Sequence, residues 1–102
     1  MARAAFVLRI KPERIADYVE AHAAVWPELR MAISMAGLRN YSIFLDDSRA
    51  FGYFEADDIE RSLAILADTA VNARWQDAMS ELLEQRVRND GPSLLPEIFR
   101  LD

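Results

Sequence analysis

The chain has 102 residues, of which 52% are hydrophobic and three are glycine, and this composition predicts one compact domain over residues 1–102. A formal net charge of −5 argues against binding to nucleic acid or to an anionic membrane, so we expect neither partner and a neutral or cationic ligand. The absence of cysteine excludes disulfides, thiolate nucleophiles and cysteine-ligated metals.

The amino-terminal residues 1–11 show no hydrophobic region followed by a small-residue cleavage site. No run in the chain approaches the roughly 20 apolar residues of a membrane-spanning helix. We therefore expect a cytoplasmic protein.

The first part of the chain predicts a strand followed by a long, interrupted helix. Residues Ala4–Ile10 favour a buried strand, and Pro12 suits the first position of a helix. Apolar residues then recur every three or four positions to about Ala36, and Gly37 ends the helix. The recurring residues are Ile15, Tyr18, Val19, His22, Trp26, Leu29 and Ile33. Because Pro27 cannot donate a backbone hydrogen bond and its ring clashes with the preceding turn, we expect a kink or restart just after His22.

The middle of the chain predicts an antiparallel hairpin. Residues 40–45 and 50–56 are rich in strand formers, and the polar residues 46–49 between them are typical of a turn. Either Asp57 or Asp58 can cap the helix that follows.

Two helical stretches and a final strand complete the prediction. Apolar spacing indicates helices over about 59–66 and about 70–83. The sequence NDGPS at 89–93 breaks the chain. The last run, Leu94–Leu101, is predicted to be a strand with Pro96 at its start or on an exposed edge.

The resulting order β-α-β-β-α-β predicts an α+β, ferredoxin-like fold with one four-stranded sheet. Helices segregated to one face would leave the other face of the sheet bare. Because soluble monomers rarely expose so large an apolar surface, we expect a homodimer that covers this face.

Tyr18 and His22 are the first candidate site residues. They lie four positions apart and therefore share one face of the predicted helix. Histidine is the residue type that exchanges protons most readily near neutral pH, and a nearby tyrosine hydroxyl can orient a substrate oxygen. Spacing alone is more typical of a partly buried structural histidine beside a core tyrosine.

Two aromatic residues elsewhere are further candidates. Tyr41 alternates with Ile43 and Leu45, so it shares their face of the second strand. Trp75 lies among polar neighbours and offers a flat ring to the apolar face of a sugar, although packing in the core explains both residues as well. The clustered carboxylates at 46, 47, 57 and 58 are typical of turns and caps, and we assign them no catalytic role. A single histidine without cysteine argues against a metal site.

The segment 18–29, YVEAHAAVWPEL, resembles the Y-x-x-x-H-x-x-[VI]-W-P-E-L signature of the L-rhamnose mutarotase family. The similarity continues in NYSIFLD at 40–46, in RWQDAM at 74–79 and in the closing EIFRLD. This resemblance implies a dimeric α/β barrel that interconverts the α and β anomers of L-rhamnose, or of a close 6-deoxyhexose such as L-fucose, without a cofactor.

The resemblance also implies roles for individual residues. His22 would be the proton donor, and Tyr18, Tyr41 and Trp75 would contact the sugar. Where the family often has a second consecutive Trp, this chain has Gln76, which would make that wall of the substrate-binding pocket more polar. Ring opening needs a proton delivered to the ring oxygen and one removed from the anomeric hydroxyl. The residues leave the acceptor of the second proton open.

Two other classes of function are compatible with the predicted fold. Small β-α-β-β-α-β dimers include monooxygenases and lactone isomerases, so the fold by itself does not select the chemistry. A non-catalytic sugar-binding module would bind without accelerating the exchange of anomers.

Overall fold

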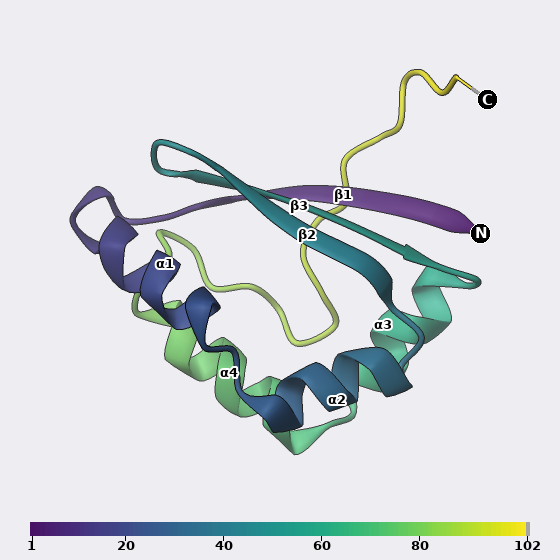
Figure 1. The fold of residues 1–102 in the computed structure, drawn as a ribbon, viewed down its shortest axis with the longest axis horizontal. Helices are drawn as coiled ribbons and strands as arrows, with labels where there is room; N and C mark the ends of the chain where they lie inside the picture. Colours follow the sequence, from purple (N-terminus) through teal and green to yellow (C-terminus); the bar gives the residue numbers. More distant parts are fainter. Residues whose placement is uncertain (102) are drawn as a thin grey trace.

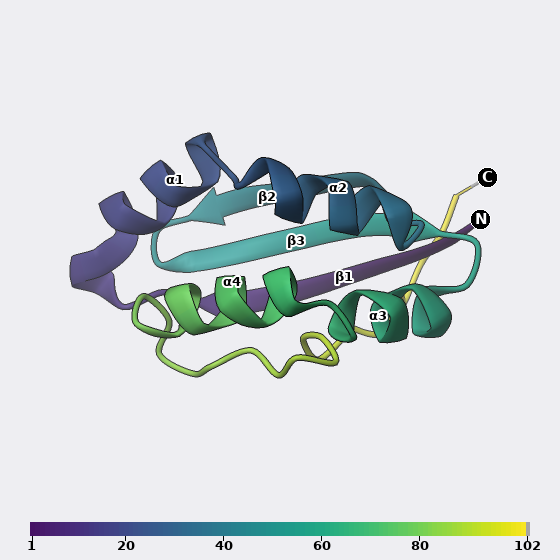
Figure 2. The same cartoon turned by 90° about the horizontal axis from the view of Figure 1, so that it is seen from below.

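The computed structural model describes residues 1–101 and places the helices on one face of a sheet (Figure 1). In chain order the elements are β1 (Ala2–Arg9), the 3-10 turn η1 (Pro12–Arg14), α1 (Ile15–Ala23), α2 (Pro27–Met35), β2 (Arg39–Asp46), β3 (Arg49–Ala56), α3 (Ile59–Ala67) and α4 (Ala70–Ser80). The predicted α+β fold is confirmed. Seen from the helical side, α1 and α2 run along the β2 side of the sheet, and α3 and α4 along the β1 side (Figure 2).

The sheet has the strand order β1-β3-β2, and both pairings are antiparallel. Alternate residues of β3, from Ala50 to Ala56, are buried beneath the helices. Gly52 belongs to this set, and a Cβ atom there would lie only 2.0 Å from Cζ of Phe6 on β1. Glycine therefore lets the Phe6 ring lie across the central strand, where it packs against Phe54.

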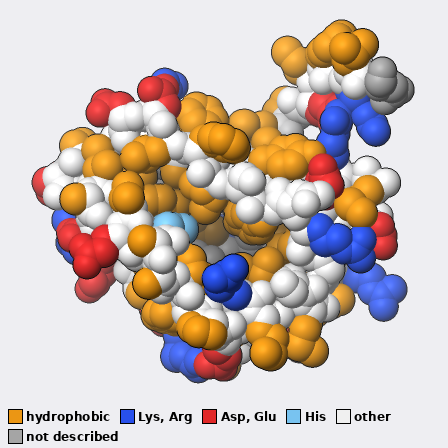
Figure 3. Space-filling model, in the orientation of Figure 1, with side chains coloured by type: hydrophobic (Ala, Val, Ile, Leu, Met, Phe, Trp, Pro, Cys, Tyr) orange, Lys and Arg blue, Asp and Glu red, His pale blue; other side chains and the backbone are white. Residues whose placement is uncertain are grey.

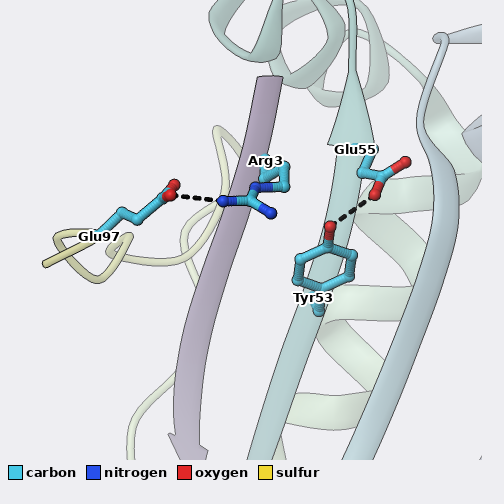
Figure 4. Close-up of polar contacts among 4 residues, drawn as sticks. All are labelled: Arg3, Tyr53, Glu55 and Glu97. Atoms are coloured by element: carbon cyan, nitrogen blue, oxygen red, sulfur yellow. Dashed lines mark hydrogen bonds and ion pairs between the residues drawn. The ribbon is translucent and has the colours of Figure 1, made fainter. Parts of the chain in front are cut away.

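The predicted fourth strand, Leu94–Leu101, is wrong, because these residues form no strand and the described sheet has three. One backbone hydrogen bond joins the segment to β1: the Leu95 N–H donates to the Ala5 carbonyl at 2.7 Å. Arg3 of β1 pairs with Glu97 at 2.6 Å (Figure 4). Pro96 lies between these contacts and has no N–H, which interrupts the ladder. Beyond them the chain leaves the body of the protein (Figure 1).

The helix predicted to end near Ala36 is divided at Pro27, as expected. The first segment, α1, ends at Ala23, and Pro27 is the first residue of α2. Proline is favoured there because the first helical N–H needs no partner within the helix. Gly37 follows α2 with a φ of +95°, a conformation that glycine adopts without strain.

Side-chain caps fix the starts of the last two helices. Asp58 caps α3 by accepting from the Arg61 N–H at 3.1 Å, and the Thr69 side chain caps α4. The helix predicted to reach Leu83 ends earlier, at Ser80. The Leu82 carbonyl instead accepts from the Lys11 N–H at 2.9 Å, which draws the chain toward the end of β1.

The larger core cluster lies between the sheet, α1, α2 and α4. Its buried members are Ile10, Tyr18, Leu29, Ala50, Val71, Trp75, Met79, Leu82, Leu83 and Val87. Two residues predicted as site candidates, Tyr18 and Trp75, thus also support the core. No helix within residues 1–101 is both long and apolar enough to cross a membrane.

Candidate active site

The last turns of α1 hold Tyr18 and His22 against each other, as their spacing predicts. The two ring centroids are 4.3 Å apart. The His22 Nδ1 atom lies 2.9 Å from the Tyr18 carbonyl oxygen. Because a carbonyl only accepts, Nδ1 carries the hydrogen of this bond. The Nε2 atom is then the nitrogen left to exchange a proton with a ligand.

Trp75 of α4 forms the next wall of the site. Its ring centroid is 5.4 Å from that of His22 and 5.0 Å from that of Trp26, with both pairs close to perpendicular. Trp26 lies in the break between α1 and α2 and packs edge-on against Trp75. Trp26 is not among the residues predicted at the site, although its place beside Pro27 in the WPEL segment is a sequence signal for it.

Tyr41 reaches the site from β2. Its ring packs on Phe6 and Phe54, with centroid distances of 6.2 Å and 5.3 Å. Tyr41 lines two cavities beside His22 and Trp75, and 38% of its surface is accessible, so the residue is only partly buried. This burial, and then the charge on nearby Tyr18, raise the pKa of Tyr41.

Both tyrosines of the site therefore stay protonated at neutral pH. Burial raises the pKa of Tyr18 to about 12, and that of Tyr41 shifts in the same direction. Neither hydroxyl donates to another group within residues 1–101. They are consequently hydrogen-bond donors available to a ligand.

Two connected spaces open beside these side chains. An outer groove of about 730 Å³ lies between α1, α2 and β2. An inner cavity of about 70 Å³ reaches toward β1 and α4. His22, Tyr41, Ile43 and Trp75 line both spaces. Figure 3 shows the hollow, with histidine at its edge.

All five residues expected at the site meet at the inner cavity: Tyr18, His22, Tyr41, Trp75 and Gln76. The Gln76 side chain is positioned by a residue that does not line the cavity, since its Nε2 donates to Asn72 Oδ1 at 3.4 Å. Asn72, which is buried, donates in turn to the Asn89 carbonyl at 3.4 Å. This chain of amides leaves the Gln76 carbonyl oxygen able to accept from a ligand.

Charged residues in the outer groove were not anticipated from the sequence. Arg30 of α2 and Arg39 at the start of β2 line it. No motif spacing identifies them, because the two arginines line one groove only when α2 packs beside β2. The carboxylates given no catalytic role are outside: among the described residues, no Asp or Glu lines either space.

Comparison with known proteins agrees with this geometry. A family model described as L-rhamnose mutarotase matches residues 3–101. The chain is 35% identical over 104 residues to an L-rhamnose mutarotase of Bacteroides thetaiotaomicron and 37% identical over 105 residues to one of Yersinia pestis, and each alignment covers all of both chains. A crystal structure of L-rhamnose mutarotase from Formosa agariphila superposes over the full length of both chains with a TM-score of 0.79 at 25% identity. The chain therefore belongs to the L-rhamnose mutarotase family.

Proposed function

We propose that this protein interconverts the α and β anomers of L-rhamnose by acid/base-catalysed opening and closing of the pyranose ring. The observation that carries the proposal is the free Nε2 of His22 beside two protonated tyrosine hydroxyls in a cavity open to solvent. A close 6-deoxyhexose such as L-fucose fits the same chemistry. The protein would then act in rhamnose metabolism in the cytoplasm.

In the proposed reaction, His22 is the proton donor. In the doubly protonated imidazolium form, its Nε2 delivers a proton to the ring oxygen as the bond between that oxygen and the anomeric carbon breaks, and water returns a proton to Nε2 afterwards. The anomeric hydroxyl loses its proton at the same time, and its oxygen becomes the aldehyde carbonyl. Rotation about the adjacent C–C bond and closure by the reverse steps give the other anomer. Protons and electrons balance, so the reaction needs no cofactor.

Few groups in the site can accept the proton that the anomeric hydroxyl loses. Tyr18 and Tyr41 are protonated and donate, so neither is a base at neutral pH. No carboxylate of the described chain lines the cavity. We therefore infer that the anomeric proton passes to water in the groove, while the tyrosine hydroxyls hold the sugar oxygens in place.

Trp75 and Gln76 would complete the sugar-binding surface. Trp75 contributes apolar surface to both spaces, and the Gln76 carbonyl oxygen can accept from a sugar hydroxyl. Interactions that are equal in the ground and transition states affect binding more than rate. We accordingly assign these two residues to binding and His22 to chemistry.

We also propose that the protein is a homodimer that closes the bare face of the sheet into a barrel. On this face Phe44 of β2 lies opposite Phe51 of β3, and the next pair brings Val7 of β1 into the same row. Phe44 is 68% exposed.

Toward the other end of the same sheet face, Tyr53 donates to Glu55 at 2.5 Å (Figure 4). That hydrogen bond, followed by one from Asn40, lowers the pKa of Glu55.

Exchange spectroscopy by NMR tests the proposed function directly. Cross-peaks between the H1 resonances of the two L-rhamnose anomers should grow faster with enzyme than in buffer that does not itself catalyse mutarotation. Binding without faster exchange would favour a sugar-binding module. Consumption of oxygen with an aromatic substrate would favour a monooxygenase.

A further inference from the structure

The outer groove is larger than the proposed substrate. A 6-deoxyhexose has 11 non-hydrogen atoms, which fill at most about 330 Å³ if each takes the roughly 30 Å³ of a liquid water molecule. The groove measures about 730 Å³. One pyranose at His22 and Trp75 therefore leaves room for a second ring toward α2 and the start of β2.

The charge of this additional space is opposite to that of the whole protein. The chain has 17 acidic and 12 basic residues. Among the described residues, however, the charged side chains that line the groove are Arg30 and Arg39. Basic side chains are also visible beside the hollow in Figure 3. A partly enclosed space lined by one sign of charge concentrates ligands of the opposite sign.

Neither guanidinium is held by a strong internal partner. Arg39 has its nearest carboxylate, Asp57, at 3.9 Å, and both side chains are more than half exposed. Arg30 has no ion pair within residues 1–101. Six other arginines are each paired with a carboxylate, at distances up to 3.3 Å: Arg3, Arg14, Arg49, Arg74, Arg86 and Arg88. The groove thus keeps available donors of the type that binds carboxylates in a fork.

We propose that the outer groove binds a carboxylate carried by a reducing saccharide whose anomeric ring lies at His22. Arg30 and Arg39 would hold the carboxylate, and the hydroxyl of Ser34, which also lines the groove, would hydrogen-bond to the same ring. The substrate class would then extend from free 6-deoxyhexoses to acidic disaccharides. The expectation of a neutral or cationic ligand followed from the net charge, whereas the local charge of the groove favours an anion. This inference rests on the proposed function for the position of the anomeric ring.

A matched pair of ligands tests the proposal. The first is an aldobiouronic acid with L-rhamnose at its reducing end, and the second is its methyl ester, which has the same rings without the charge. Dissociation constants measured by NMR titration should favour the acid by about threefold or more at low salt, as two partly exposed ion pairs would produce. The preference should shrink in 0.5 M NaCl, because salt screens exposed charges.

Substituted proteins test whether the preference for the acid over its ester arises from Arg30 and Arg39. In the doubly substituted protein with Arg30→Gln and Arg39→Gln, the ratio of the two dissociation constants should fall to about one. Arg61→Gln removes the same charge from α3, outside the groove, and should keep the parent ratio. Equal binding of acid and ester by the parent, or a preference that survives the double substitution, would overturn the inference. Because the titration measures binding alone, it is distinct from failure of the proposed function, which would appear as an absence of anomer exchange with L-rhamnose.

Discussion

Replacing Tyr18 by Phe should remove part of the protein's loss of stability at alkaline pH. Burial raises the pKa of Tyr18 from 10.0 to about 12. Below pH 10 the hydroxyl is neutral in both the folded and the unfolded state. Above pH 10 the unfolded state ionises first, so the free energy of unfolding falls until the pH passes about 12. Two pKa units at about 1.4 kcal/mol each amount to about 2.7 kcal/mol, of which about 1.4 kcal/mol is lost by pH 11.

Urea unfolding at pH 8 and pH 11 measures this effect. The fall in unfolding free energy between the two pH values should be smaller by about 1.4 kcal/mol in Tyr18→Phe than in the parent. At pH 8 the variant should be nearly as stable as the parent, because the Tyr18 hydroxyl has no partner within residues 1–101. An equal fall in Tyr18→Phe and parent would refute the reasoning.

Two further substitutions test binding and assembly. Trp75→Ala removes a side chain that is 8% exposed and packs on Trp26, so it should cost about 3–5 kcal/mol of stability in chemical denaturation. It should also raise the half-saturating concentration of L-rhamnose more than it lowers kcat, and an unchanged half-saturation would restrict Trp75 to the core. Phe44→Lys places a charge on the bare sheet face, opposite Phe51, and should convert a dimer to a monomer by light scattering. Met35→Lys, at an exposed position on α2, should remain dimeric, and a dimeric Phe44→Lys would place the interface elsewhere.

Much of the fold is predictable because local signals agree with the final packing. Pro27 cannot continue the first helical segment, which ends at Ala23, and it is the first residue of the next. Its position in the sequence therefore predicts where the helix is divided. Gly37 supplies the positive φ at the end of α2. The hairpin turn follows in the same way from the short polar residues at 46–49, where Asp47 adopts a φ of +55°.

The carboxyl-terminal segment shows where local signals fail. Leu94–Leu101 has the apolar content of a strand, but a strand also needs a partner along its length. Pro96 removes one donor beside the single ladder bond at Leu95. Ile98 and Phe99 are then 93% and 77% exposed. The apolar sequence pattern predicts that these side chains are buried, but no part of the described chain covers them.

The candidate site was predictable to the extent that its residues share a helix face or a motif. The four-residue spacing of Tyr18 and His22 already placed their rings together. The approach of Tyr41 from β2 and Gln76 from α4 depends on how α1 and α4 pack on the sheet, so only the family resemblance indicated it. Arg30 and Arg39 have neither kind of signal, because only the tertiary fold places both in the lining of the groove.

The central claim is that His22 carries the proton in anomer exchange, and His22→Asn tests it most directly. Asparagine keeps a polar side chain of similar size but cannot exchange a proton near neutral pH. General acid catalysis of this kind contributes about 10²–10⁴-fold to a rate. Exchange between the H1 resonances of the two L-rhamnose anomers, followed by NMR at fixed pH, should fall by that factor while circular dichroism remains that of the parent. Exchange at the parent rate in a folded His22→Asn protein would contradict the account.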